Sequence, residues 1–232
     1  MKVAVRSLIM LFVIFTFAQL AAAQMGMGGP PSLAGVFSPT VGSGASYETV
    51  RKEGAEKKTF DMYVVGKEAG GYWIEYAMQN PHMGGGSMYM KTLLTHQGDD
   101  VMIQRTIMQM PGRPPMDMTS MMKMHPMQSQ QSKADMRAEA ENLGTESITT
   151  PAGTFPCQHW RSKKDGSEYW ISDKVSPWQL VKMTGKDQTI TLTRVITDAK
   201  THITGTPVSM EEMMKQHMGN MGGASGADEH QH

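Results

Sequence analysis

Methionine is the residue whose number and spacing point most directly to chemistry in this sequence. The chain has 232 residues, of which 25 are Met, and six of these fall within residues 116–127 beside His125. Thioether sulfur is a soft ligand that suits Cu(I), and imidazole suits copper generally. One hypothesis is therefore a copper site, with soft ligands at Met116, Met118, Met121, Met122, Met124, His125 and Met127.

The same methionines have a second interpretation, because Met is also a flexible apolar side chain that fills irregular cavities. Methionine occurs throughout the chain, in predicted strands, helices and tails. This spread is more typical of a chain that is rich in Met generally than of one concentrated metal site. A Met-rich lid would be a deformable apolar cover that suits a ligand of loose shape. On this interpretation, ligand contacts are expected at Met116, Met118, Met121 and Met122.

The sequence lacks the familiar catalytic motifs. It contains no G-x-S-x-G, no H-E-x-x-H and no G-x-x-x-x-G-K-[ST]. Cys157 and His159 are two residues apart, so on a strand they would share one face. A lone Cys is more often a small buried side chain than a nucleophile. We therefore expect a protein that is not an enzyme, and the Cys157–His159 pair is the basis of the alternative.

Charge and hydropathy narrow the classes of partner. The 22 basic and 22 acidic residues give a formal net charge of zero, so nothing draws the whole chain to nucleic acid or anionic membranes. A mean hydropathy of −0.38 excludes a multi-span membrane protein. The single Cys excludes a disulfide within the chain. An apolar small molecule is the expected partner, no cofactor is expected, and the oligomeric state is left open.

The first 23 residues are typical of a secretory signal peptide. Lys2 and Arg6 precede an apolar run over residues 8–20, and three alanines at 21–23 supply a cleavage site. The run is shorter than the ~20 residues that a membrane span needs, although an uncleaved anchor is the alternative. The mature protein is therefore expected in the periplasm or outside the cell, with no stable membrane span.

The rest of the chain divides by composition. Residues 24–45 are rich in Gly, Pro and Met and are expected to form a flexible arm, and residues 219–232 a disordered tail. Between them we expect an antiparallel β domain over residues 46–207, with a Met-rich insertion at 111–142, followed by a helix over 208–218. Ser209 would cap that helix, with Glu212 three residues later. Ser132 would cap another helix over 132–143.

Alternating apolar residues predict the strands. Tyr72, Ile74 and Tyr76 share one face of a strand at 71–78, and similar alternation occurs at 59–65 and 189–196. A further strand carries Val101, Ile103 and Ile107, with Arg105 on the same face. One covered and one wet face per strand is typical of an antiparallel sheet.

Residues 146–182 contain the pattern Pro-Ala-Gly-Thr-Phe-x-Cys, then Tyr-Trp-Ile-Ser, then Pro-x-x-Leu-Val-Lys. This pattern resembles exported bacterial proteins related to the LolA-like lipoprotein-carrier superfamily. The resemblance implies an incomplete antiparallel β-barrel whose concave face holds acyl chains or other apolar groups and is covered by helices. It transfers no individual lipid-contacting residue to this chain.

Together these observations predict a mainly β (α+β) protein, a curved antiparallel sheet or half-barrel with one or two covering helices. Its expected function is to bind or carry an apolar, lipid-like ligand in the bacterial envelope, and its alternative function is to bind copper. Besides the Met lid, the expected ligand-facing residues are Tyr72, Ile74 and Tyr76.

Overall fold

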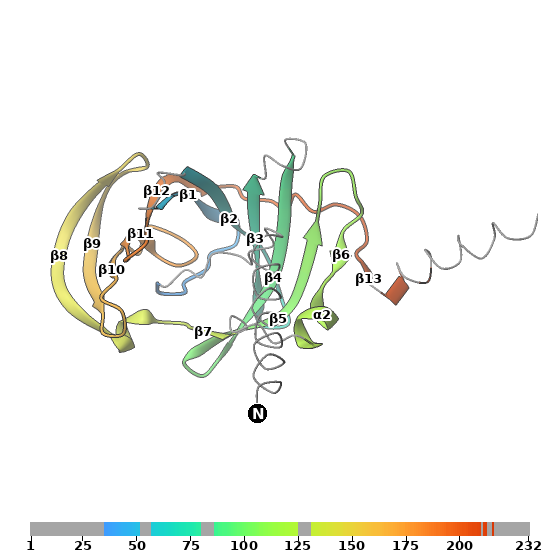
Figure 1. Cartoon of the computed structure of the whole chain (residues 1–232), viewed down its shortest axis with the longest axis horizontal. Helices are drawn as coiled ribbons and strands as arrows, with labels where there is room; N and C mark the ends of the chain where they lie inside the picture. Colours follow the sequence, from blue (N-terminus) through green and yellow to red (C-terminus); the bar gives the residue numbers. More distant parts are fainter. Residues whose placement is uncertain are drawn as a thin grey trace, which may run out of the picture. The chain divides into compact units, whose positions relative to one another are not determined.

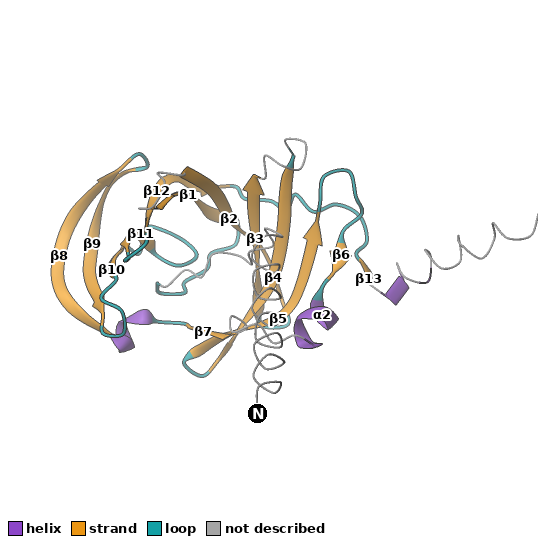
Figure 2. Ribbon diagram, viewed as in Figure 1, coloured by secondary structure: helices purple, strands orange, loops and turns teal. Residues whose placement is uncertain are grey.

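Thirteen strands form one open, mostly antiparallel sheet in the part of the chain that the structure describes (Figures 1 and 2). The computed structural model describes residues 35–51, 57–79, 86–124, 131–209, 211, 212 and 215. The strands are β1 (Ser43–Arg51), β2 (Lys57–Glu68), β3 (Gly71–Gln79), β4 (Ser87–Gln97), β5 (Asp100–Gln109), β6 (Met116–Asp117), β7 (Gln131–Lys133), β8 (Ala140–Thr150), β9 (Gly153–Ser162), β10 (Glu168–Ile171), β11 (Leu180–Thr184), β12 (Gln188–Thr197) and β13 (Val208–Ser209). The predicted fold class, a mainly β chain with a curved antiparallel sheet, is confirmed.

The order of the strands joins the two ends of the domain at the centre of the sheet. Along the sheet it is β13-β6-β5-β4-β3-β2-β1-β12-β11-β10-β9-β8, and β7 pairs with β5 off this path. β1 pairs with β12, so Ser43 lies opposite Thr197. β13 runs parallel to β6, with Val208 opposite Met116. Apart from β5–β7, the remaining pairs join strands that follow one another in the chain.

The inner face of the bent sheet carries the main hydrophobic core, which includes Met62, Ile74 and Leu192. The segment 35–40 and the loop 172–179 lie within the bend (Figure 1). They meet where the Phe37 ring packs against Trp178, with the ring centroids 4.8 Å apart. The Val36 N–H also donates to the Trp178 carbonyl at 3.0 Å. Irregular chain, rather than a helix, thus covers this part of the core.

The outer face carries a smaller core under the segment 199–207, here called the strap. This core contains Trp73, Leu93, Ile107 and, from the strap, Ile203. The strap runs from β12 to β13 (Figure 1). Glu75, which has no exposed surface, holds the strap by accepting hydrogen bonds from the Thr201 hydroxyl and from His202.

The predicted helix over 132–143 is wrong. Residues 131–133 form β7, Met136–Glu139 form a single 3-10 turn (η2), and β8 begins at Ala140. Pairing of β7 with β5 and of β8 with β9 outweighs the helix propensity of the Ala and Glu residues here. The α-helix within the described residues is α2 (Thr119–Met124), so one short helix stands where one or two covering helices were expected.

At the C-terminal side, the predicted capping box is present. The Ser209 N–H donates to the Glu212 carboxylate at 2.8 Å, and the Glu212 N–H donates to the Ser209 hydroxyl at 3.1 Å. Val208 and Ser209, which the prediction placed in this helix, form β13 instead, whereas Glu211, Glu212 and Lys215 have helical backbone. The other residues of the predicted helix 208–218 lie outside the described residues.

The ordered strands begin slightly earlier than the predicted domain boundary at residue 46. Residues 43–45 belong to β1, and the Phe37 N–H donates to the Ala134 carbonyl at 2.7 Å. Residues 24–34 of the expected arm, the expected signal peptide at 1–23 and the expected tail at 219–232 lie outside the described residues.

Candidate functional site

Three methionines lie side by side across three neighbouring strands. Met90 of β4 lies opposite Met108 of β5, and Met108 lies opposite Met116 of β6. Directly opposed residues in antiparallel strands point to the same face, with Cα atoms about 4.5–5.5 Å apart. Tyr76, which belongs to the inner core, lies opposite Met90 on its other side. The three thioethers therefore share the inner face of the sheet.

The neighbouring rows add further methionines to this face. Met78 lies opposite Met88 in the row beside Tyr76 and Met90. On the other side of the row, the Met118 N–H donates to the Thr106 carbonyl at 2.8 Å, which continues the β5–β6 register by one residue beyond Asp117. We call Met78, Met88, Met90, Met108, Met116 and Met118 the methionine patch. Each of them is partly exposed, whereas Met62 and Ile74 on the same face have no exposed surface.

A buried hydroxyl lies next to the patch. Thr106 is two residues before Met108 on β5, so it points to the same face. Its side chain is only 2% exposed, and its Oγ1 has no hydrogen-bond partner among the described residues. The neighbouring Thr92 hydroxyl, by contrast, donates to the Ile74 carbonyl at 3.4 Å. A buried hydroxyl without a partner costs stability, so Thr106 marks a place where a bound group would be favoured.

The structure brings together only some of the residues expected from the sequence. Met116 and Met118 belong to the methionine patch, and Met121 is partly buried in α2. Met122 and Met124 lie on the α2 backbone, but the structure does not describe their side chains, and His125 and Met127 lie outside the described residues. The ligand and metal roles of this set therefore stay predictions.

The three expected aromatic and aliphatic contacts also lie on the inner face. Ile74 has no exposed surface, Tyr76 is 6% exposed, and Tyr72 packs partly buried against the Phe37 ring. Burial raises the pKa of Tyr76 to about 12. These side chains belong to the packed core beneath segment 35–40, and the partly exposed part of the same face is formed by the methionine patch. Their ligand role also stays a prediction.

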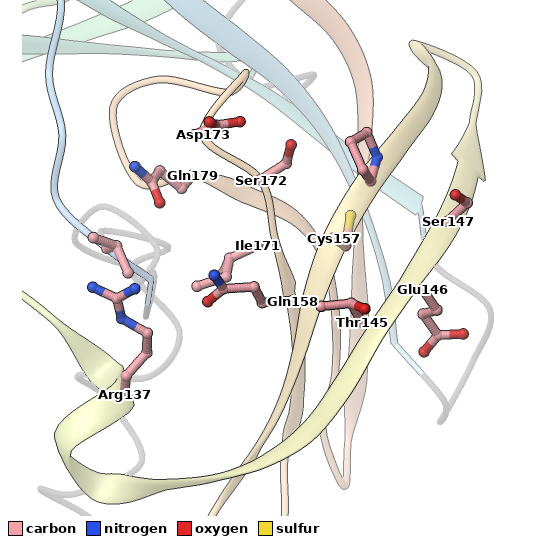
Figure 3. Close-up of a pocket in the computed structure, with 12 residues that line it drawn as sticks. Arg137, Thr145, Glu146, Ser147, Cys157, Gln158, Ile171, Ser172, Asp173 and Gln179 are labelled. Carbon is pink, nitrogen blue, oxygen red and sulfur yellow. The ribbon is translucent and has the colours of Figure 1, made fainter.

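A polar pocket of about 610 Å³ lies at the other end of the sheet, at β8 and β9 (Figure 3). Arg137 approaches it from η2, and Ser172, Asp173 and Gln179 come from the loop after β10 (Figure 3). Its lining is Val36, Arg137, Thr145, Glu146, Ser147, Pro156, Cys157, Gln158, Ile171, Ser172, Asp173 and Gln179. The guanidinium of Arg137 is already paired with Asp135 at 2.6 Å. Amide, hydroxyl and charged groups make this pocket unsuitable for an apolar ligand.

Cys157 and His159 do not form a nucleophile–base pair. The Cys157 thiol donates to the Phe155 carbonyl at 3.4 Å, and burial raises its pKa to about 11. His159 stacks on Trp170, with the ring centroids 4.4 Å apart. Its two ring nitrogens lie 3.0 Å from the Glu146 carboxylate and 3.2 Å from that of Glu168. The thiol therefore stays protonated at neutral pH, which disfavours nucleophilic attack.

The described residues contain no group of three or more His, Cys, Asp or Glu side chains placed to hold a metal ion. No helix formed by them has the length and apolar character needed to cross a membrane.

No protein-family model and no curated protein matches the chain. Among solved structures it is similar to MucB in complex with MucA(peri), with a TM-score of 0.43 and 7% identity, covering 71% of this chain and 53% of MucB. MucB alone gives a TM-score of 0.40 and 9% identity, over 71% of this chain and 57% of that one. This chain thus spans about half the length of MucB.

Two structures of similar length to the domain also match. A candidate lipoprotein from Parabacteroides distasonis gives a TM-score of 0.33 and 18% identity, over 71% of this chain and 100% of that one. A candidate exported protein with a YmcC-like fold from Bacteroides fragilis gives a TM-score of 0.32 and 13% identity, over 70% of this chain and 99% of that one. All these TM-scores are below 0.5, so the proposals that follow rest on this chain's own residues. The relationship to LolA-like carriers stays a prediction.

Proposed function

We propose that this chain is an exported, non-catalytic protein that binds an apolar, lipid-like ligand on the methionine patch. The observation that carries the proposal is the difference in exposure along one sheet face. The inner face is sealed where Phe37 and Trp178 cover it and is partly open where Met90, Met108 and Met116 form it. An apolar surface left partly open is the part of the face on which an apolar ligand gains most by burial.

The chemistry of the patch fits an acyl chain better than a rigid or polar ligand. The Met90–Met108–Met116 row crosses three strands, or about 10 Å at the usual strand spacing. Unbranched thioether side chains can adapt to a chain that has no fixed shape. Each methylene that leaves water contributes about 0.8 kcal/mol, so the affinity should rise with the length of acyl chain that lies along the row.

Titration with a fluorescent fatty-acid analogue tests this proposal. Saturable binding is expected, and Met108→Asp should weaken it about tenfold or more, because a carboxylate would replace an apolar contact. Met108→Leu keeps the apolar surface and should bind like the parent chain. Met102→Asp is the matched control, since Met102 lies on β5 opposite Thr95, between Val101 and Ile103 of the inner core, and so points to the outer face.

Equal binding by the parent chain and Met108→Asp would overturn the proposed site. Export is tested separately by the intact mass of protein recovered from the envelope or medium, which should correspond to a chain that begins at Gln24. Recovery of the full-length chain in the cytoplasm would contradict the proposed location.

A further inference from the structure

We propose that Met90, Met108 and Met116 bind one Cu(I) ion, with Met118 as an available fourth thioether. This inference goes beyond the proposed apolar ligand, because it depends on the sulfur atoms and not on the apolar character of the side chains. It also assigns different residues from the sequence-based copper hypothesis. Only Met116 and Met118 are common to both sets, and no residue of α2 is needed.

The register of the sheet supplies the geometry. The three residues lie directly opposite one another on β4, β5 and β6, and they share one face. Neighbouring Cα atoms in the row are about 5 Å apart and the outer two about 10 Å, and each Met has three rotatable bonds, so the three sulfurs can converge on one ion above Met108. Met118 follows Met116 on the same face, and its N–H is fixed to the Thr106 carbonyl at 2.8 Å.

The surrounding charges allow a soft monovalent cation. Lys91 and Arg105, which flank the row along β4 and β5, belong to the outer face, where they lie 5.1 Å and 5.5 Å from the centroid of the Trp73 ring. Their positive charges therefore face away from the row. The row itself offers neutral thioethers, which suit Cu(I) and do not suit hard cations such as Mg²⁺ or Ca²⁺.

The unpaired Thr106 hydroxyl is a second, independent observation at the same place. It lies beside Met108 on β5 and across the sheet from Met118, and its Oγ1 has no partner among the described residues. Where Met118 leaves the fourth position open, a water in that position would donate a hydrogen bond to this oxygen and so satisfy a buried group that is otherwise unpaired.

Competition with a chromogenic Cu(I) chelator under anaerobic, reducing conditions tests the proposal. The parent chain should withdraw one equivalent of Cu(I) from the chelator. A Met90→Leu/Met108→Leu/Met116→Leu variant should lose that equivalent or weaken it about 100-fold, because leucine offers no donor. These swaps nearly conserve volume, so the variant should fold, which far-ultraviolet circular dichroism checks.

The control is Met121→Leu/Met122→Leu/Met124→Leu, which removes the same number of sulfurs from α2 and should leave Cu(I) binding unchanged. Parent-like affinity in the first variant, or loss of binding in the control, would overturn the assignment. Fatty-acid binding separates the two proposals, since the first variant should retain it while losing Cu(I). Fatty-acid binding by Met108→Asp tests the apolar site, whereas Cu(I) binding by the first triple-leucine variant tests the copper site.

Discussion

The backbone N–H and the Nδ1 of His202 both lie 2.8 Å from Oε1 of Glu75, a carboxylate with no exposed surface. The two residues are 127 positions apart in the chain. The second carboxylate oxygen accepts from the Thr201 hydroxyl, so both oxygens of Glu75 have partners in the strap. One buried side chain of β3 therefore fixes the strap over the outer core.

Glu75→Leu should destabilise the protein, although it replaces a buried polar group with an apolar one. The substitution leaves the Thr201 hydroxyl and the His202 N–H without their acceptor and releases Ile203 from the outer core. We expect the free energy of unfolding to fall by about 3 kcal/mol, as measured by urea denaturation. Lys200→Ala, which removes an exposed partner of Asp198 in the same segment, should leave stability unchanged.

Gly35→Ala should loosen the cover of the inner core. A Cβ at Gly35 would overlap the carbonyl oxygen of Trp178, to which the next residue donates a hydrogen bond. We expect the free energy of unfolding to fall by about 2 kcal/mol, because segment 35–40 or the loop 172–179 must move. Gly66→Ala is the matched control, since its Cβ would meet only the Trp73 ring at 3.9 Å. Thermal melts of both variants measure the difference, and equal melting temperatures would contradict this account.

Alkaline pH should destabilise the protein through its buried tyrosines. Burial raises the pKa of Tyr47 and of Tyr76, the latter to about 12, whereas an unfolded tyrosine has a pKa of about 10. Above pH 10 the unfolded chain releases protons that the folded chain retains, so unfolding becomes more favourable as pH rises. Between pH 10 and 12, each of these two tyrosines should lower the free energy of unfolding by about 1.4 kcal/mol per pH unit.

Urea denaturation at pH 8, 10 and 11 measures this dependence. Tyr76→Phe should reduce the slope above pH 10 and leave the behaviour below pH 9 unchanged. A free energy of unfolding that stayed constant from pH 8 to 11 in the parent chain would show that these hydroxyls are not buried as described.

Cys157 should react slowly with alkylating agents in the native protein. With its pKa raised to about 11, the folded thiol at pH 8 has about 100-fold less thiolate than an unfolded one. Iodoacetamide labelling should therefore be slow without urea and fast with it. His159→Ala should not change the native rate, because His159 is engaged by Glu146 and Glu168. Slower labelling in that variant would restore the Cys–His hypothesis.

The strands with regular alternation could be predicted from the sequence. Phe60, Met62 and Val64 all belong to the inner core of β2, as their spacing predicts, and Ile190 and Leu192 do so on β12. Period two is a local property, so it survives without knowledge of the neighbours. The capping box of Ser209 and Glu212 could be predicted for the same reason.

The methionine row could not be predicted, because it depends on a β-bulge. Near the turn Gln97 lies opposite Asp100, and beyond the register shift at Leu93 and Leu94 the pairing has moved by one residue. Without that shift Met90 would oppose Ile107, and Met108 would point to the outer face. Strict alternation predicts that Arg105 shares a face with Val101 and Ile103. The bulge explains why Arg105 lies on the opposite face instead. The sequence shows the repeated Met-x-Met at 88/90 and 108/110, but it does not show how the two strands that carry these residues pair.

The cover of the inner core by segment 35–40 also could not be predicted from the sequence. Phe37 follows a stretch rich in Gly and Pro, whose composition predicts flexibility, yet its ring packs against Trp178. Composition reports what a segment can bury by itself, whereas this contact depends on a loop far away in the sequence.

The pairing of β1 with β12 has a consequence for how the chain is made. The centre of the sheet needs Ser43 and Thr197 together, so an emerging polypeptide cannot complete its ladder until almost all of it has been synthesised. Such long closures slow folding. A newly made copy should therefore lack its complete sheet until synthesis has passed Thr197.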